Sequence, residues 1–266
     1  MSLAACSSED FRAALAPYLA QMPARLSLLA GWAQRDDIPL FRAGDGFAAL
    51  EPGLGSLVTH AWPAEEDAAL LTEAMQCLGR PPSKIVSSPD EARRLATGVV
   101  AGHGCVAHEA MHTACYRLAQ LLPRVRPGQL RTAQTSEIAM LQDWDEAMAL
   151  DAKLGQTEAS FVRGLTPLSV ERGRRRIWDD EGPRCTLGFV PVGSAWRIVL
   201  VYTPPQHRGR HYASAAVSAL CSELLDKSGA GAVISLYADL DNPASNRVYR
   251  GIGFVLEGEQ LSIELE

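Results

Sequence analysis

The pattern of apolar and polar positions predicts the same series of elements twice along the chain. In the first stretch, a hairpin over residues 39–50 turns at Gly44-Asp45-Gly46, because Asp-Gly tolerates the positive φ of a tight turn. A strand over 57–61 follows. Pro63 then leads into a helix over 65–77, which has an acidic first turn and helical apolar spacing.

The second stretch repeats this order. A hairpin over 174–190 turns at 179–182, a strand covers 198–202, and Pro204-Pro205 leads through a loop into a helix over 212–227. Two copies of one unit explain the repeat, so we expect an internal duplication.

The remaining segments complete an α/β fold with a mixed central sheet flanked by helices. Residues 11–34 have helical spacing, which Pro17 and Pro23 are expected to break into short pieces. Strands over 118–125 and 129–133 flank Pro127-Gly128, and a helix over 138–154 begins the second copy. We therefore predict two domains, 1–127 and 128–266, each resembling the other in order of elements.

Composition narrows the class of protein. The chain has 266 residues, 47% hydrophobic content and a net charge of -6, which argues against a nucleic-acid partner because phosphate binding needs a basic face. No apolar run reaches the roughly 20 residues that cross a bilayer, so no membrane partner is expected. The six scattered cysteines lack the spacing of a disulfide scaffold and indicate a cytoplasmic protein.

The segment from Val199 to Ala213 has the features of an anion site. A β-branched strand enters a loop containing Arg208, Gly209 and Arg210, and the loop enters a helix, whose first N–H groups and positive dipole end favour phosphate. Gly209 permits close approach of the backbone, and the two guanidinium groups add charge. The basic run 172–176 is interpreted as a solvated loop or strand end, with electrostatic guidance of phosphates as the alternative.

A second block follows about thirty residues later. Residues 232–237 are typical of a strand. Asn242 is placed to cap a short helix with Pro243 at its first position, and Gly251 and Gly253 are placed to end it.

Together the two blocks resemble the GNAT family of N-acetyltransferases over residues 130–266. The family's loop motif is Gln or Arg, two residues, Gly, one residue, then Gly or Ala; Gln206 and Gly209 match its first two places, and His211 departs from the third. The family's second hallmark is matched throughout, by Asn242, Ser245, Tyr249 and Gly253-Phe254.

The resemblance implies a catalytic second domain that takes acetyl-coenzyme A as cosubstrate, needs no metal, and acetylates a primary amine by direct attack. Tyr249 would then protonate the departing thiolate. The acceptor would be a small molecule or a peptide, and the protein a monomer or homodimer. Backbone at Leu200, Val201 and Tyr202 would bind the pantetheine arm. The remaining cofactor residues that the resemblance implies are His207, Arg208, Gly209, Arg210, His211, Tyr212, Ala213, Asn242, Ser245 and Asn246.

The sequence leaves the base and the acceptor pocket open. Candidates to deprotonate the amine are Tyr237, Asp239, Asp241, Glu137 and Glu158. Trp178 and Trp196 either line the acceptor site or pack in the core.

Two other functions remain as alternatives. His108-Glu109-Ala110-Met111-His112 matches the zinc-hydrolase pattern, but that pattern needs a helix, and the apolar spacing here fits a strand equally well. The second alternative is a non-catalytic sensor or partner module that only binds acyl-coenzyme A. In the first copy, the acidic segment 63–67 stands where the second has 206–210, so that copy is predicted not to bind the cofactor.

Overall fold

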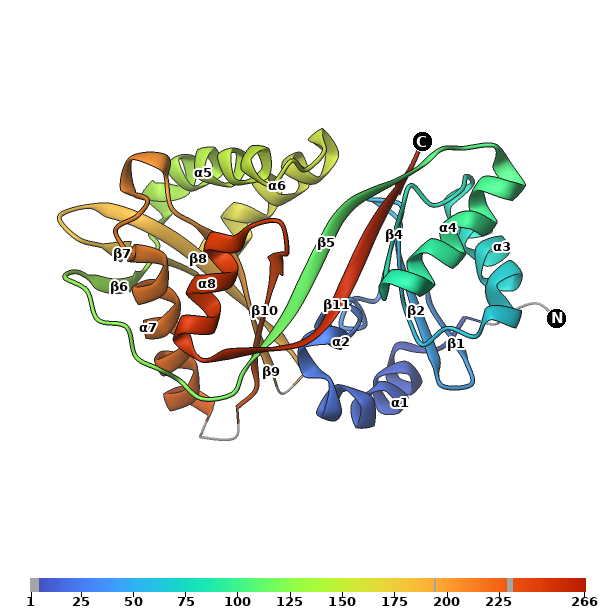
Figure 1. Ribbon diagram of the computed structural model, residues 1–266, viewed down its shortest axis with the longest axis horizontal. Helices are drawn as coiled ribbons and strands as arrows, with labels where there is room; N and C mark the ends of the chain where they lie inside the picture. The colour runs from blue at the N-terminus through green and yellow to red at the C-terminus, as the bar shows by residue number, and fades with distance from the viewer. Residues whose placement is uncertain (1–4, 194, 229–231) are drawn as a thin grey trace. The chain divides into compact units, whose positions relative to one another are not determined.

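The computed structural model describes residues 5–193, 195–228 and 232–266 (Figure 1). The chain forms two compact units. Unit 1 consists of Met1–Cys115, Asp239–Asp241 and Glu257–Glu266, and unit 2 consists of Tyr116–Ala238 and Asn242–Leu256. The predicted boundary at residues 127/128 lies inside unit 2. The division of the sequence into domains 1–127 and 128–266 stays a prediction.

Unit 1 contains four helices and short strands that match most of the predicted elements. Its helical elements are α1 (Ser8–Gln21), α2 (Pro23–Trp32), η1 (Ala64–Glu66), α3 (Asp67–Leu78) and α4 (Pro89–His103). Its strands are β1 (Leu40–Ala43), β2 (Gly46–Glu51), β3 (Ser56–His60) and β4 (Lys84–Ser87), with most of β5 (Ala107–Leu118) and of β11 (Phe254–Leu265).

The sheet of unit 1 is completed by the last residues of the chain. β1, β2 and β3 pair antiparallel in sequence order, and β3 pairs parallel with β4. β4 then pairs antiparallel with β11, with Leu261 opposite Ser87 and Ile263 opposite Ile85. Both isoleucines and Leu261 are buried in the core of unit 1. Residues 1–127 therefore do not contain every strand of unit 1, because β11 comes from the end of the chain.

Unit 2 contains the elements that surround the predicted cofactor segment. Its helical elements are η2 (Thr135–Glu137), α5 (Ile138–Asp151), α6 (Gln156–Glu171), η3 (Pro205–His207), α7 (Tyr212–Ser228) and α8 (Pro243–Ile252). Its strands are β6 (Gln129–Thr132), β7 (Arg175–Asp179), β8 (Pro183–Val192), β9 (Ala195–Tyr202) and β10 (Ile234–Asp239).

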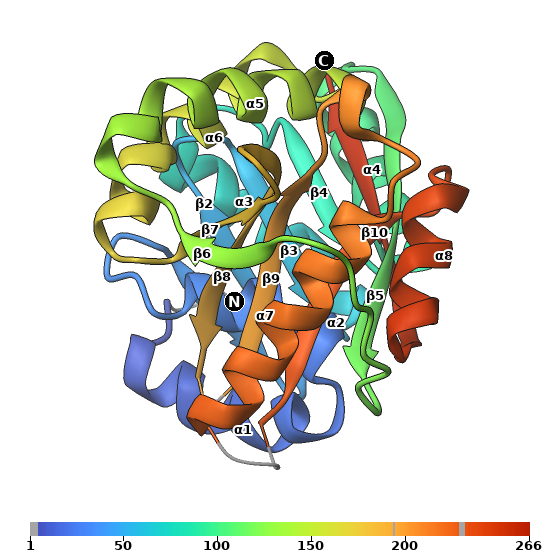
Figure 2. The same cartoon turned by 90° about the vertical axis from the view of Figure 1, so that its left-hand side faces the viewer.

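The strands of unit 2 form a mixed sheet. β6, β7, β8 and β9 pair antiparallel in that order, and β10 joins β9 in parallel. Helix α7 packs against β7, β8 and β9 and also contacts α8, while α5 packs against α6 and contacts β9. Figure 2 shows α7 lying in front of β8 and β9.

The repeat in the order of elements is confirmed, and it is longer than the sequence pattern indicates. Two helices, a hairpin, a strand, a short 3-10 turn, a helix, a strand, a helix and a final strand occur from α1 to β5 and again from α5 to β11. Each copy therefore supplies a full set of helices and strands.

Two local predictions are wrong. Pro17 lies inside α1 and does not end it, whereas Pro23 begins α2 as predicted. The strand expected over 118–125 is instead β5, which ends at Leu118. Residues 119–128 form an extended connector without a strand. Its backbone bonds to helix ends and side chains, such as Leu122 N–H to Ile252 O (2.7 Å), replace a strand ladder.

The basic run 172–176 includes the beginning of a strand, as one of its interpretations had it, but its last two arginines are not solvated. Arg175 is fully buried and Arg176 nearly so, because β7 is an internal strand. Arg176 is paired with Glu223 on α7 (2.5 Å). These two guanidinium groups are structural and do not form a solvated loop.

No helix in the described part of the chain combines the length and apolar character required to cross a membrane.

Candidate functional site

The strand that precedes the predicted phosphate loop separates from its parallel neighbour. The register of β9 with β10 runs from Trp196 opposite Ile234 to Ile198 opposite Leu236. Both strands continue beyond this point, β9 to Tyr202 and β10 to Asp239. The backbone of the last four residues of β9 therefore has an edge that β10 does not pair, which is where a ligand can bind as an added strand.

A β-bulge lies on the same part of β9. Gly188 pairs with Val199 and Thr186 with Tyr202, so Leu200 and Val201 stand opposite one residue of β8. Leu200 has φ +54, in the left-handed region that a leucine rarely adopts. The bulge redirects the strand beside the unpaired edge, at the residues predicted to bind pantetheine.

The loop after β9 leaves a row of backbone donors at the start of α7. The N–H groups of His207 and Arg208 bond to the carbonyls of Pro204 and Pro205 (2.9 and 3.2 Å). The first turn of a helix lacks intrahelical acceptors, and here Ala215 N–H is the first to be bonded, to His211 O (3.1 Å). The backbone N–H groups from Gly209 to Ala213 are therefore among those left without a backbone acceptor, whereas those of His207 and Arg208, which the resemblance also assigned to the cofactor, are already bonded.

Both Gly209 (φ +73) and His211 (φ +62) have left-handed backbone. A histidine at such a position occupies a place that favours glycine. The family motif therefore also fits two residues further along, with Arg208 first, His211 in place of glycine and Ala213 last. Either register of the motif includes the backbone N–H groups of Gly209 and His211.

Arg208 is engaged inside unit 2. Its guanidinium pairs with Asp151, donates to Thr203 O (2.9 Å) and lies over the Tyr202 ring. This pairing neutralises one of the two positive charges that the sequence assigned to phosphate binding. Arg210, by contrast, is exposed at the tip of the loop.

Two other nitrogens near the loop are buried without a hydrogen-bond partner among the described residues. They are Nδ1 of His207 and Nε of Arg126, whose guanidinium lies over the ring of Tyr212 (4.7 Å). Arg126 Nε is a donor at any pH near neutral; burying an unpaired donor costs about 1–3 kcal/mol, and a bound anion would remove that cost. The residues present thus fit a phosphate group at the start of α7.

Helix α8 begins and ends as predicted. Asn242 accepts a hydrogen bond from Ser245 N–H (3.1 Å), Pro243 stands at the first helical position, and Gly253 ends the helix with φ +105. Asn246 is buried, donates to Asn242 O (2.8 Å) and accepts from the Tyr116 hydroxyl (2.9 Å). The side-chain amides of Asn242 and Asn246 therefore build the helix start and its attachment, and their role toward a cofactor stays a prediction.

Tyr249, the predicted proton donor, projects from α8 into the interior of unit 2. It is 6% exposed and packs against the rings of Tyr116 and Phe254. Burial raises the pKa of Tyr249 well above its ordinary value, and the nearby Cys185 raises it further. Tyr249 is thus protonated at neutral pH, which is the state that a proton donor requires.

Cys185 links Tyr249 to the end of β9. Burial raises the pKa of the Cys185 thiol to about 12, while Thr203, just after β9, acts in the opposite direction. The thiol therefore stays protonated at neutral pH and is a poor nucleophile. Tyr249, Cys185 and Thr203 together place the predicted donor near the segment where β9 leaves β10.

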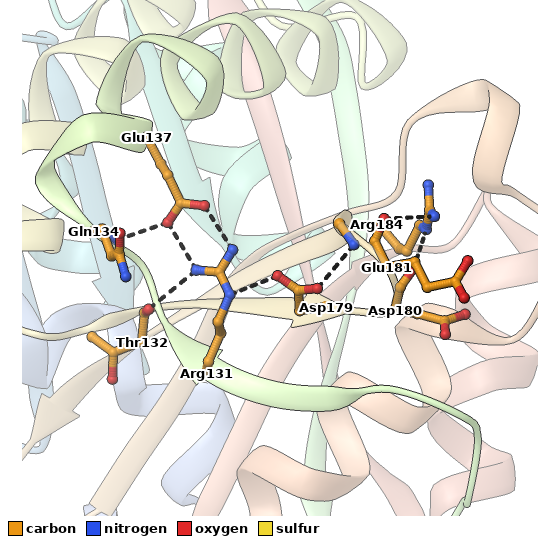
Figure 3. A network of polar contacts seen from close by, with 9 residues as sticks. Arg131, Thr132, Gln134, Glu137, Asp179, Asp180, Glu181 and Arg184 are labelled. Atoms are coloured by element: carbon orange, nitrogen blue, oxygen red, sulfur yellow. Dashed lines mark hydrogen bonds and ion pairs between the residues drawn. The ribbon is translucent and has the colours of Figure 1, made fainter.

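The candidate base Glu137 is occupied by a structural network. Its carboxylate accepts from Arg131 (2.7 and 2.9 Å) and from Gln134 N–H (2.8 Å), and Arg131 also pairs with Asp179 (2.7 Å; Figure 3). The Arg131 guanidinium lowers the pKa of Glu137, which makes it a weaker base. This network joins η2 to the β7–β8 hairpin.

The other candidate bases differ in their surroundings. Tyr237 lies under the guanidinium of Arg197 (5.4 Å), and Asp239 accepts from the backbone N–H of Asp241 (2.9 Å). Glu158 lies close to Gly155 at the start of α6. The contacts of these side chains do not single out one of them as the base for the acceptor amine.

The two tryptophans have structural partners. Trp178 Nε1 donates to Pro127 O (3.2 Å), and Trp196 Nε1 donates to Ser228 Oγ (2.9 Å) at the end of α7. Both contacts fit the packing role that the sequence offered as one of two interpretations.

The zinc-like motif lies on β5, a strand, so the helical spacing on which it depends is missing. Glu109 pairs with Arg93 (2.6 Å) and His112 with Glu259 (2.8 Å). Among the residues that the structure describes, no three His, Cys, Asp or Glu side chains gather as a metal site requires.

In unit 1, carboxylates stand at the place that corresponds to the loop of unit 2. Asp67, the first residue of α3, pairs with Arg94 (2.8 Å). The buried Glu91 accepts from the N–H of Trp62 (3.3 Å) and from the hydroxyl of Thr59. Carboxylates of the protein itself thus lie at the start of α3, where the corresponding helix of unit 2 has a loop with Arg208 and Arg210.

Residues 169–254 match the acetyltransferase (GNAT) family, so the C-terminal half of the chain contains a GNAT-family domain. A search of curated proteins finds no match.

Solved structures share the fold over nearly the whole chain. A Drosophila protein is 14% identical, with a TM-score of 0.70, and the match covers 99% of this chain and 98% of that one. A GCN5-related N-acetyltransferase from Kribbella flavida is 19% identical, with a TM-score of 0.59 and coverage of 91% and 94%.

A tandem GNAT protein from the clavulanic acid biosynthesis pathway, solved without acetyl-coenzyme A, is 12% identical. Its TM-score is 0.55, and the match covers 100% of this chain and 97% of that one. The chain therefore has the fold of tandem GNAT structures.

Proposed function

We propose that unit 2 transfers an acetyl group from acetyl-coenzyme A to a primary amine. The observation that carries this proposal is the separation of β9 from β10 at Ile198, with a bulge at Leu200 and free amides from Gly209 to Ala213 directly after it. An unpaired strand edge suits the amide-containing pantetheine arm, and a helix start suits its pyrophosphate.

The proposed reaction proceeds as follows. The acceptor amine attacks the thioester carbonyl, the carbon–sulfur bond breaks, and Tyr249 donates its proton to the departing sulfur. The amine loses a proton to a base that the geometry leaves unassigned. Direct transfer accords with the buried, protonated state of Cys185, which disfavours an acyl-cysteine.

We also propose that unit 1 does not bind the cofactor. Asp67, Glu65 and Glu66 surround the start of α3, and a phosphate would meet negative charge there. Unit 1 would then serve as a scaffold.

The first experiment is calorimetric titration with acetyl-coenzyme A of the parent, Gly209→Glu and Gly209→Gln. Both substitutions impose the same strain, because Gly209 has φ +73, and a Cβ there would meet no atom within 4 Å. Only the glutamate adds a negative charge at the phosphate position. We expect binding by the parent, weaker binding by the glutamine variant and none by the glutamate variant; a parent that does not bind contradicts the proposal.

The second experiment separates an enzyme from a cofactor sensor. Acetylation of a panel of primary amines is measured with the parent and with Tyr249→Phe. The variant should keep its affinity for acetyl-coenzyme A and lose about a hundredfold or more in transfer rate, since it cannot donate the proton. Binding without transfer to any amine would favour the sensor, and an unchanged rate in the variant would exclude Tyr249 as the donor.

A further inference from the structure

The connector formed by residues 119–128 is fixed to two helices and one strand of unit 2. Its Leu122 N–H donates to Ile252 O (2.7 Å), and Arg124 N–H donates to Ser218 Oγ on α7 (3.0 Å). The Arg124 guanidinium also bonds to Gly251 O, and Pro127 O accepts from Trp178 Nε1 (3.2 Å). Figure 2 shows the connector crossing α7 on its way to β6. Arg126 is therefore held between two anchored neighbours.

The side chain of Arg126 lies at the first turn of α7. Its guanidinium carbon is 4.7 Å from the centroid of the Tyr212 ring, and Tyr212 is the first residue of that helix. The ring is itself held in place, because its hydroxyl donates to Asp180 (2.8 Å). Nε of Arg126 is buried without a hydrogen-bond partner among the described residues. A cation with an unused donor is thus positioned beside the proposed phosphate site.

The surroundings of this cation favour a ligand with several negative charges. Arg184 is held by the carbonyls of Asp180 and Glu181 (2.8 and 3.2 Å; Figure 3). Burial lowers the pKa of His207, and the positive charges of Arg184 and Arg210 lower it further. Both charges therefore lie near the loop. Asp180 supplies one opposing carboxylate, so the net local charge is positive.

We propose that Arg126 binds the 3′-phosphate on the ribose of coenzyme A. This inference rests on the proposed function, in which the amides from Gly209 to Ala213 already bind the pyrophosphate. Arg126 comes from a different segment than the loop, and its guanidinium lies over the ring of Tyr212 at the same helix end, so we assign it to the third phosphate of the cofactor. Guanidinium groups bind phosphate by charge-assisted hydrogen bonds.

The test compares coenzyme A with dephospho-coenzyme A, which lacks only the 3′-phosphate, by calorimetric titration. The parent should bind coenzyme A about tenfold to a hundredfold more tightly than the dephospho form, as for the loss of a hydrogen bond between charged groups. Arg126→Gln should lose this preference and keep its affinity for the dephospho form. Arg172→Gln, which removes an exposed arginine at the end of α6, is the matched control and should keep the preference.

Each other outcome counts against the inference. Equal affinity of the parent for both ligands, or equal losses for both in Arg126→Gln, would show that Arg126 does not bind the 3′-phosphate, while the proposed function would stand. If the parent binds neither ligand, the proposed function fails together with this inference. The comparison on the parent alone needs no variant, so it decides the question even if Arg126→Gln folds poorly.

Discussion

Arg175 on β7 and Asp145 on α5 form an ion pair in which neither side chain is exposed to solvent. Asp145 also accepts from Thr166 on α6 (2.6 Å), and Arg175 donates to Thr186 on β8 (2.9 Å). Four elements of unit 2 thus meet at one buried pair of charges.

We predict that Arg175→Met destabilises the protein by about 3–5 kcal/mol, because it leaves the Asp145 carboxylate buried and unpaired. Arg175→Met combined with Asp145→Leu should recover most of that loss. The measurement is urea denaturation of the parent, both single variants and the double variant. A single-variant loss below about 1 kcal/mol would show that the pair is not the main support of this junction.

His60 in unit 1 should make stability depend on pH. Burial lowers the pKa of His60 from 6.5 to about 4, and Arg25 contributes to this shift. As the pH falls from about 6.5 toward 4, the unfolded chain binds a proton that the folded chain rejects, so stability falls by at most about 3 kcal/mol.

The check is the free energy of unfolding of the parent, His60→Gln and His103→Gln at pH 7 and pH 4.5. His60→Gln should show a smaller fall than the parent. His103 is exposed on α4, and its variant should keep the fall of the parent. An equal fall in all three proteins would contradict the role of His60.

Each chain should bind one molecule of acetyl-coenzyme A. Calorimetric stoichiometry on the parent tests this, and Glu65→Gln with Glu66→Gln should leave the stoichiometry and affinity unchanged because the start of α3 does not bind the cofactor. Two sites per chain, or binding that survives Gly209→Glu at full affinity, would contradict the proposal that unit 1 does not bind the cofactor.

The local elements of the fold could be predicted from the sequence. The hairpin turn before β2, the cap at Asn242 with Pro243, and the helix from Tyr212 each depend on residues close in sequence, and all three are present, although the positive φ of the turn lies at Gly44 and not in the Asp45-Gly46 pair. Local backbone preferences act over a few residues, so they are visible in the pattern.

The candidate site was predictable in part for the same reason. The loop from Gly209 to Ala213 and the α8 block lie within continuous segments, and their spacing identified the family later matched over 169–254. Arg126 had no signal in the sequence, because its importance comes from contact with Tyr212, a residue far along the chain.

The sequence by itself determined the repeated order of elements, the family, and the short segments that cap and turn. Only the tertiary structure decided that residues 257–266 complete unit 1, that Arg175 is buried against Asp145, that Arg208 is paired with Asp151, and that the zinc-like motif lies on a strand. Strand pairing and the burial of charge depend on partners distant in sequence, and local propensity carries no information about which partner is chosen.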